Sequence, residues 1–531
     1  MFFTLQRYIF RDLLRIFILA TVGLTLILSL GGILQPVQQY GVGPRQVVNL
    51  LVYFLPITLT FVLPMAALFA SALTYGRFAV DNELDACRAS GVALPTLIYP
   101  GFVLALLVAI ANLLLSFHVM PYFMHRAESS LKADAKRILF RNLQRKGFYR
   151  LSPDGKYLLY ADYVDPKNDT LFGIVAVQHE PEGVKRIITA EMTRVQIDPH
   201  DRFNEVQLAI HNARQIGAPA DDDWVRVGSM LLKTSFESLL TDKIKFKKVD
   251  EMKQIRADLM RFNPVAKIAR TAYGQLATEA LARDMAETWR AAPGSFYALP
   301  SGSGTVRISA TACALDKPQV ITLTPPVLVR EYDDRTGQCL RRLRCERANL
   351  HVEDDPAQPR LGLDLRGEQE EETSPLVHYV LGDLSLPATI RRELERDPIL
   401  QTLTPDRTAA LLGAPPSSLL AGQQAYLRTI INKVLTDLAS ETNSRLVFGI
   451  GCIPMILIGI GLGILQKGGH LLGAFGVSCL PAALLGAAIL GGKHLIKGVA
   501  APEFSGILVM WAGLGLLGLL AAVVYRRLLR Q

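Results

Sequence analysis

A short acidic segment near the N-terminal third of the chain carries the residue types best placed for chemistry. It contains Asp81, Asn82, Glu83, Leu84, Asp85, Cys87, Arg88 and Gly91. Asp81 or Asn82 would cap a short helix, whose first turn then holds Glu83 and Asp85 beside the positive end of the helix dipole. Gly91 suits the left-handed residue that ends such a helix. The spacing predicts a helix of two to three turns.

One face of this helix, which spans 81–91, would combine an apolar side chain, a thiol and a basic side chain. Leu84, Cys87 and Arg88 fall at neighbouring positions, because residues three and four apart are adjacent on a helix. Two interpretations stay open at this point. The segment is either a connecting helix with nothing docked on it, or an acidic and apolar docking surface for a motor subunit.

Catalytic motifs are absent from the rest of the sequence. Neither a nucleotide-binding P-loop, nor His-Glu-x-x-His, nor Gly-x-Ser-x-Gly occurs, and Gly492-Lys493-His494 has Ala487 where a P-loop needs its first glycine. The run 221–223 of three aspartates is interpreted as a solvated loop. We therefore expect no catalytic residue, no metal and no cofactor, and a chain that is not an enzyme.

Six apolar stretches flank the acidic segment and the middle of the chain. Each is about as long as the roughly 20 residues that a membrane-spanning helix requires. They are 16–34, 47–74, 95–117, 446–465, 471–491 and 504–525. Glycine and proline inside them are compatible with membrane helices. The expected fold is an α-helical polytopic membrane protein with six spans, three on each side of an inserted extracytoplasmic domain.

Charges in the short connections predict the orientation, because cytoplasmic loops carry an excess of Lys and Arg. With the N-terminus inside, the cytoplasmic segments hold Arg7, Arg11, Arg15, Arg77, Arg88, Lys467, Arg526, Arg527 and Arg530. The short outer loops hold only Arg45, Lys493 and Lys497. Both termini are therefore expected in the cytoplasm. The net charge of +9 partly reflects these anchors, so it does not indicate a nucleic-acid partner.

The polar middle of the chain is expected to be mostly β-structure. Short β-branched and aromatic runs between 157 and 210, separated by Pro and Asp turns, predict a jelly-roll-like sheet. Helical periodicity over 252–290, further strands between 320 and 365, and a helix over 391–437 follow. The predicted segments are 1–121 (spans one to three), 122–250 (jelly-roll-like domain), 251–390 (additional block), 391–445 (helical return) and 446–531 (spans four to six).

Three cysteines fall in this outer region. Cys313, Cys339 and Cys345 allow at most one internal disulfide. A Cys339–Cys345 bridge, a Cys313–Cys339 bridge and isolated buried thiols all stay open, and no zinc-type CxxC spacing occurs.

The second apolar stretch and the acidic segment together resemble a known family. The quoted residues are Leu55-Pro56, then Leu-Pro-Met-Ala-Ala-Leu-Phe-Ala-Ser-Ala-Leu-Thr-Tyr-Gly-Arg-Phe, then Asp-Asn-Glu-Leu-Asp-Ala-Cys-Arg-Ala-Ser-Gly-Val. This pattern is similar to the LptF/LptG family, the permease subunits of the lipopolysaccharide export ABC transporter. Glu441-Thr-Asn-Ser-Arg445 and Gly461-Leu-Gly-Ile-Leu in the C-terminal half agree with it. The resemblance is most specific from about 55 to 95.

The resemblance implies several partners. In this family the loop helix docks in a groove of a cytoplasmic ATPase, expected as a dimer, and the family's glutamate aligns with Glu83. Asp81, Leu84, Arg88 and Gly91 would belong to the same coupling surface. A second permease chain, periplasmic bridge proteins and a lipid cargo would complete the assembly in the cell inner membrane. ATP hydrolysis would then occur on the separate ATPase chain, and the outer β-domain would pass the lipid on.

Glycines in spans four and five are candidates for close helix contact. They include Gly459, Gly461, Gly463, Gly473 and Gly476. Either a moving interface or static packing would explain them. The chain also departs from the family, since its outer region holds the additional block 251–390 and its first span, 16–34, has no Lys or Arg.

Two other function classes are weighed against a lipid-export permease. A mechanotransmitting ABC subunit would usually have four spans rather than six. A membrane-anchored periplasmic binding module would not need a capped acidic helix on the cytoplasmic side.

Overall fold

The structure is a computed structural model of the chain, and it divides into two compact units. One unit comprises 1–253 with 436–531, and the other comprises 254–435. The structure describes all residues except 1, 41–43, 134, 151–156, 181–182, 200–203, 217–223, 237–242, 303, 334–336, 354–359, 370–376, 466–470, 498–502 and 531. The aspartate run 221–223 therefore lies outside the described residues.

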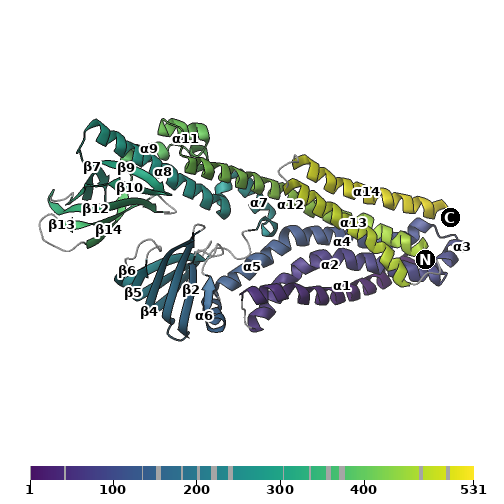
Figure 1. The fold of residues 1–531 in the computed structure, drawn as a ribbon. Coiled ribbons are helices and arrows are strands. Elements are labelled where there is room, and N and C mark those ends of the chain that lie inside the picture. The colour runs from purple at the N-terminus through teal and green to yellow at the C-terminus, as the bar shows by residue number, and fades with distance from the viewer. Residues whose placement is uncertain are drawn as a thin grey trace. The chain divides into compact units, whose positions relative to one another are not determined.

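Long helices form the membrane part of the first unit. They are α1 (Phe2–Tyr40), α2 (Pro44–Val80), α4 (Leu94–Leu114), α12 (Ser418–Leu465), α13 (Leu471–Lys497) and α14 (Glu503–Arg530). Each expected apolar stretch falls inside one of them, except that the third ends in a five-residue π-helix, η1 (Leu115–Val119). Both chain termini lie at the same end of these helices, next to the short helix α3 (Glu83–Ala89) (Figure 1).

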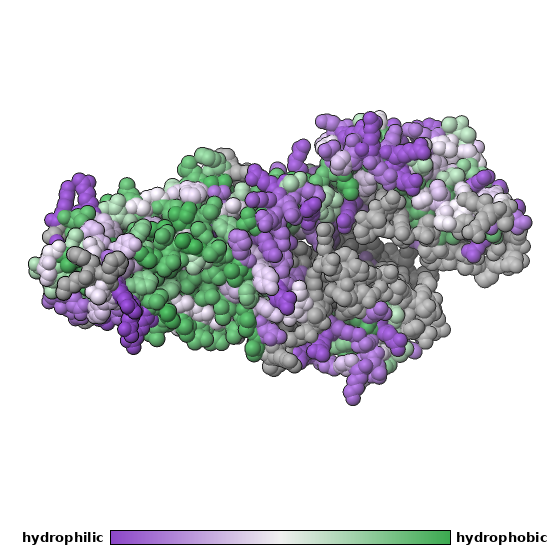
Figure 2. Space-filling model, turned by 180° about the vertical axis from the view of Figure 1, so that it is seen from behind, coloured by the Kyte–Doolittle hydropathy of each residue, from purple (hydrophilic) through white to green (hydrophobic). Residues whose placement is uncertain are grey.

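Five of these helices are long and apolar enough to cross a membrane within the described part of the chain. In the sixth, α13, the apolar part with described side chains is the shorter stretch Leu480–Ile496. On the face that Figure 2 shows, apolar side chains gather over the middle of the helices, with hydrophilic residues toward both ends. The membrane class of the fold is confirmed, and the count of six spans stays a prediction.

A continuous apolar core holds several of the expected spans together. Buried side chains from α1, α2, α4, α12 and α14 meet there, among them Tyr75, Leu97, Ile460 and Val524. The hydroxyl of Tyr75 donates a hydrogen bond to the carbonyl oxygen of Leu97 (2.9 Å), which links α2 to α4.

A six-stranded antiparallel sheet completes the first unit. It consists of β1 (Phe148–Arg150), β2 (Tyr157–Asp165), β3 (Thr170–Glu180), β4 (Gly183–Pro199), β5 (Asn204–Ile216) and β6 (Trp224–Phe236). The strands follow one another in sequence order. This order is that of a meander, because each hairpin places a strand beside the preceding one, whereas a jelly roll places non-consecutive strands side by side. The inserted β-domain was therefore expected correctly, but its strand order was not.

Helices α5 (Met120–Ala133) and α6 (Ala135–Lys146) lead from the membrane to this sheet. Leu139, Phe140 and Leu143 of α6 are buried in one cluster with Leu159 and Leu171 of the sheet. The amphipathic stretch after the third span thus packs its apolar side on the sheet.

The second unit combines helices with a larger sheet. Its helices are α8 (Asn263–Ala291), α9 (Ala388–Leu394), α10 (Ile399–Thr402) and α11 (Pro405–Leu412), and α7 (Val249–Ala257) lies at its boundary. Its strands are β7 (Tyr297–Pro300), β8 (Gly304–Ser309), β9 (Ala312–Lys317), β10 (Val320–Thr324), β11 (Val327–Asp333), β12 (Cys339–Glu353), β13 (Arg360–Gln369) and β14 (Val377–Ser385). The eight strands form one sheet with the main order β14-β13-β12-β11-β8-β7.

The helical periodicity expected over 252–290 is confirmed by α7, the 3₁₀ turn η3 (Leu259–Arg261) and α8, in whose first turn Pro264 stands. The single helix expected over 391–437 is wrong. The stretch 391–437 is broken into α9, α10, α11 and α12, because Pro398 and Pro405 begin new segments. All described cysteines, including Cys313, Cys339 and Cys345, are free thiols.

Candidate functional site: the charged regions of the membrane unit

Apolar residues anchor the short helix α3 to the membrane helices. Leu84 is only 4% exposed and lies in the core cluster with Tyr75 and Phe78 of α2. Cys87, one turn later, is partly buried against the same cluster. The side chain of Leu84 is therefore occupied within the chain, so it positions α3 rather than offering a free contact.

Gly91 ends this helix as the sequence predicts. It has φ +84°, in the left-handed region. The N–H of Gly91 donates to the carbonyl oxygen of Arg88 (2.9 Å), and the N–H of Val92 donates to that of Cys87 (3.1 Å). These two bonds form a Schellman motif, which satisfies carbonyl groups left open at the end of a helix.

The expected side-chain cap at the start of α3 is wrong. Asn82 occupies the capping position, but its backbone is left-handed (φ 56°) and its side chain makes no capping hydrogen bond. A capping side chain needs an extended backbone. Only two residues separate α2 from α3. The left-handed backbone of Asn82 belongs to the turn that ends α2, so Asn82 cannot also adopt the extended conformation of a cap. Asp81 donates its N–H to the carbonyl oxygen of Arg77 (2.9 Å) and forms the same turn.

Charged side chains of the segment point outward. Asp81, Glu83 and Arg88 are exposed. Within the described part of the chain Glu83 forms no ion pair. Arg77, by contrast, is paired with Asp12 of α1 at 2.7 Å. The segment thus presents an exposed carboxylate on a short helix whose apolar side is fixed to the membrane core.

Glycines of α12 allow close contact with two other helices. A methyl group added at Gly463 would meet the carbonyl oxygen of Ala72 at 2.8 Å and the backbone nitrogen of Gly76 at 3.1 Å, both on α2. At Gly459 it would meet Leu68 of α2, and at Gly461 it would meet Val524 of α14. The expected close packing is therefore present at these three glycines. Gly473 and Gly476 lie in α13, but their surroundings fall outside the described contacts.

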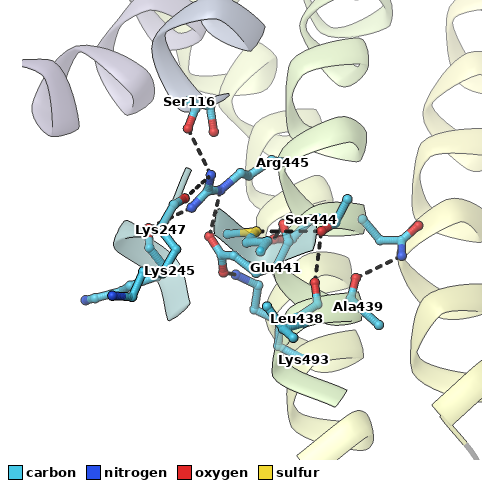
Figure 3. Close-up of polar contacts among 12 residues, drawn as sticks. Ser116, Lys245, Lys247, Leu438, Ala439, Glu441, Ser444, Arg445 and Lys493 are labelled. Carbon is cyan, nitrogen blue, oxygen red and sulfur yellow. Dashed lines mark hydrogen bonds and ion pairs between the residues drawn. The ribbon is translucent and has the colours of Figure 1, made fainter. Parts of the chain in front are cut away.

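A buried charge cluster that the sequence analysis missed lies on α12 and α13 (Figure 3). Arg445, whose side chain is 4% exposed, donates from Nε to the Glu441 carboxylate (3.1 Å). Lys493 of α13 donates from Nζ to the other Glu441 oxygen (2.9 Å). The guanidinium also donates to the carbonyl oxygens of Ser116 (3.1 Å), Lys245 (2.7 Å) and Lys247 (3.4 Å).

The π-helical turn η1 explains why one of these carbonyl groups is free to accept. Its bonds run from residue i to residue i−5, as in the bond from the Met120 N–H to the Leu115 carbonyl. The donor for the Ser116 carbonyl would then be residue 121, which is a proline and has no N–H. Arg445 supplies the missing donor.

This cluster joins four segments that are distant in sequence. They are η1, the strap that includes η2 (Ile244–Phe246), α12 and α13. Burial lowers the pKa of Lys245, and the neighbouring Lys243 charge lowers it further. The sequence signal for the cluster was the pair Glu441 and Arg445, four residues apart and next to an apolar span.

Described residues of α4, α12 and α14 line two apolar grooves. One of about 470 Å³ runs between α12 and α14 and is lined by Ile453, Leu514 and Gly518. A second, of about 350 Å³, adjoins α4 and shares Leu457 and Tyr525 with the first. Neither is lined by residues of α1, α2 or α13.

A comparison with protein-family models gives a match. The family model for the lipopolysaccharide export system permease LptF/LptG matches residues 7–299, which is more than half of the chain. The matched region includes α3 and the six-stranded sheet and extends to β7, while the cluster residues Glu441, Arg445 and Lys493 lie beyond it. No curated protein matched the chain.

Proposed function

Because the chain belongs to the LptF/LptG family of lipopolysaccharide export permeases, we propose that it extracts an amphipathic lipid from the inner membrane and passes it to its outer β-domain. Members of this family are transporter subunits and not enzymes. The work of extraction would come from ATP hydrolysis on a separate cytoplasmic chain. The observation that carries the proposal is the exposed, unpaired Glu83 on a helix anchored in the membrane core.

Coupling would run through α3. An ATPase that binds the exposed carboxylate would move the helix, and Leu84 and Cys87 would transmit that movement to the apolar core. The core holds α2, α4, α12 and α14 in contact, so a displacement of α3 is mechanically connected to most of the bundle. In this scheme Asp81 and Arg88 contribute exposed charge, and Gly91 fixes the end of the helix.

An apolar stripe on α1 supports contact with acyl chains or with a second permease chain. Leu19, Val22, Leu26 and Leu30 are between 55% and 77% exposed. Their spacing places them along one side of the helix. Two such permease chains would enclose an apolar, laterally open cavity lined by the first, second and fifth spans.

A row of apolar side chains on the six-stranded sheet supports transfer of the lipid. Tyr163 of β2 lies opposite Phe172 of β3, which lies opposite Met192 of β4. The three are 63%, 38% and 41% exposed. Exposed apolar rows of this kind suit acyl chains, which gain by leaving water.

The orientation follows from the charges of the short loops. Both termini and α3 would lie in the cytoplasm, and both β-sheets would lie in the periplasm. Partners would be an ATPase dimer, a second LptF/LptG-like chain and periplasmic bridge proteins.

Co-purification of an ATPase tests the proposal. The native chain, Glu83→Arg and a control, Glu393→Arg, would be purified in detergent from cells that express the transporter. Glu393 is an exposed residue of α9, so the control makes the same charge change away from α3. We expect ATPase activity to co-purify with the native chain and the control, and to fall at least tenfold with Glu83→Arg. Absence of ATPase from the native preparation would overturn the proposal.

A further inference from the structure

The two apolar grooves on α4, α12 and α14 join into one strip along α14. They share Leu457 of α12 and Tyr525 of α14. The hydroxyl of Tyr525 donates a hydrogen bond to the carbonyl oxygen of Leu457 (3.1 Å), so its polar atom is satisfied and its ring is left for the groove. The centre of the strip therefore presents apolar surface.

The strip is long enough for an acyl chain of one membrane leaflet. Its residues on α14 run from Leu514 to Leu529, which is about 22 Å along the helix axis. Half of the hydrocarbon core of a bilayer is about 15 Å thick. One acyl chain therefore fits along the strip through the whole depth of its leaflet.

Gly518 widens the strip without packing against another helix. It lines the larger groove, and a methyl group added there would meet no atom of the described residues within 4 Å. The glycines at 506 and 513 of the same helix pack against α13 instead. Glycine is unfavourable inside a helix. Helix packing within the chain accounts for the other two glycines but not for Gly518.

Arginines stand at one end of the strip. Arg526 is four residues after the lining residue Ala522 and three before the lining residue Leu529, so it lies on the same side of α14. Arg530 follows one turn later. Both arginines are exposed, and within the described residues neither forms an ion pair. The single acidic residue of α4 and α14 is Glu503, at the opposite end of α14.

We propose that the strip binds an acyl chain of an anionic phospholipid, whose headgroup phosphate lies against Arg526 and Arg530. Long arginine side chains near the end of a membrane helix reach the interface where lipid phosphates lie. Basic residues on the cytoplasmic side attract the anionic lipids of that leaflet. The assignment to the cytoplasmic leaflet rests on the orientation in the proposed function, whereas the apolar strip and its arginines do not.

Charge favours a phospholipid over the membrane helix of a partner protein. The cytoplasmic ends of membrane helices carry an excess of Lys and Arg. A partner helix in the strip would place such residues against Arg526 and Arg530, whereas an anionic headgroup offsets their charge. The lining helices are also not those assigned above to the cavity between two permease chains. The phospholipid is thus a resident ligand of the permease and not its cargo.

Photocrosslinking of the full chain in detergent tests the acyl-chain site. The probes are phosphatidylglycerol, which is anionic, and phosphatidylethanolamine, which is zwitterionic, with the same diazirine-labelled acyl chain. Labelled peptides are identified by mass spectrometry. Gly518→Leu fills the strip. Gly515→Leu is its control, because Gly515 lines neither groove and an added methyl group there also has open space.

A second pair of variants tests the headgroup contact. Arg526→Gln/Arg530→Gln removes both charges at the end of the strip. Its control, Arg7→Gln/Arg11→Gln, removes two exposed charges with the same spacing from α1, which lines neither groove.

We expect phosphatidylglycerol to label α4 and α14 of the native chain, and to label both controls within twofold of that amount. Labelling should fall at least fivefold in Gly518→Leu. It should fall at least tenfold in Arg526→Gln/Arg530→Gln, since each basic residue near the membrane surface strengthens the attraction about fivefold. Phosphatidylethanolamine should label the native chain at least fivefold less. An equal loss in a variant and its control, equal labelling by the two lipids, or label confined to other helices would overturn the proposal.

Melting temperatures separate loss of the site from loss of folding. Gly518→Leu should keep the native melting temperature without lipid, because its side chain enters open space, and should lose the rise that phosphatidylglycerol causes in the native chain. Labelling of the isolated chain that disappears when the chain is purified with its partners would place a protein in the strip and overturn the proposal. Since the crosslinking needs no ATPase and leaves Glu83 intact, this test and the co-purification test fail independently.

Discussion

The buried cluster around Glu441 and the short helix α3 each contain a carboxylate, but one carboxylate is paired and the other is exposed. Glu441 has Arg445 and Lys493 as partners, and its side chain is only 15% exposed. Glu83 is exposed and has no ion-pair partner in the described chain. The charge of Glu441 therefore holds segments together that are distant in sequence. The charge of Glu83 remains available to a second molecule.

The two regions also differ in what anchors them. The buried cluster depends on polar bonds to three backbone carbonyl groups. The helix α3 depends on the apolar side chains of Leu84 and Cys87. Mutations should therefore affect stability in the first region and association in the second.

Arg445→Met is expected to have the largest effect on stability. It leaves the carbonyl of Ser116 and two others without their donor and removes one partner of Glu441. Removal of one partner of a buried ion pair costs about 3–5 kcal/mol. Thermal unfolding in detergent measures the loss. Arg428→Met, at an exposed position of the same helix, is the control and should change the melting temperature little.

Leu84→Ala is expected to weaken the anchor of α3. A buried Leu→Ala change costs about 2–5 kcal/mol, and here we expect the lower end because α3 is short. Hydrogen exchange should rise within α3, and ATPase association should fall although Glu83 is intact. Leu529→Ala, at a position that is 65% exposed, is the comparison. Unchanged exchange in α3 would count against the anchoring role.

Gly463→Leu tests the close contact between α12 and α2. A side chain at this position meets the backbone of Ala72 and Gly76, which cannot rotate away. Overpacking costs about 1–3 kcal/mol. Gly486→Leu is a matched control, because an added methyl group there has no atom within 4 Å. Equal melting temperatures for the two variants would refute the tight contact.

Glu83→Arg is expected to have the smallest effect on stability. Glu83 is exposed but stands in the first turn of α3, so reversing its charge loses a favourable interaction with the helix dipole that is worth about 0.3–1 kcal/mol. Asn82 makes no side-chain cap, so the start of α3 does not depend on a capping side chain. A clear drop in melting temperature would mean that Glu83 is structural, and the comparison between the two regions would then fail.

Local sequence signals predicted much of the membrane part. Long apolar stretches specify helices wherever they occur, so the expected spans coincide with helices of the structure. Gly91 was predicted correctly because the end of a helix is a local property. The expected cap at Asn82 failed since two adjacent helices compete for the same residue.

Features that depend on contacts between distant parts of the chain could not be predicted from these local sequence signals. The meander order of the first sheet depends on pairing between strands, which composition does not encode. The buried cluster was missed because its acceptors are backbone carbonyls, such as that of Ser116, which any residue type can provide. The proline at 121 was visible, but its consequence depends on a π-helical turn.

Paired measurements on Glu83→Arg and Arg445→Met test the central claim most directly. Each variant would be assayed for melting temperature and for co-purifying ATPase activity, the latter at a temperature where both are folded. The account predicts that Glu83→Arg loses the ATPase and keeps the native melting temperature, while Arg445→Met loses several degrees and keeps the ATPase. If Glu83→Arg retains the ATPase, or if Arg445→Met loses it while folded, the separation of the two regions is contradicted.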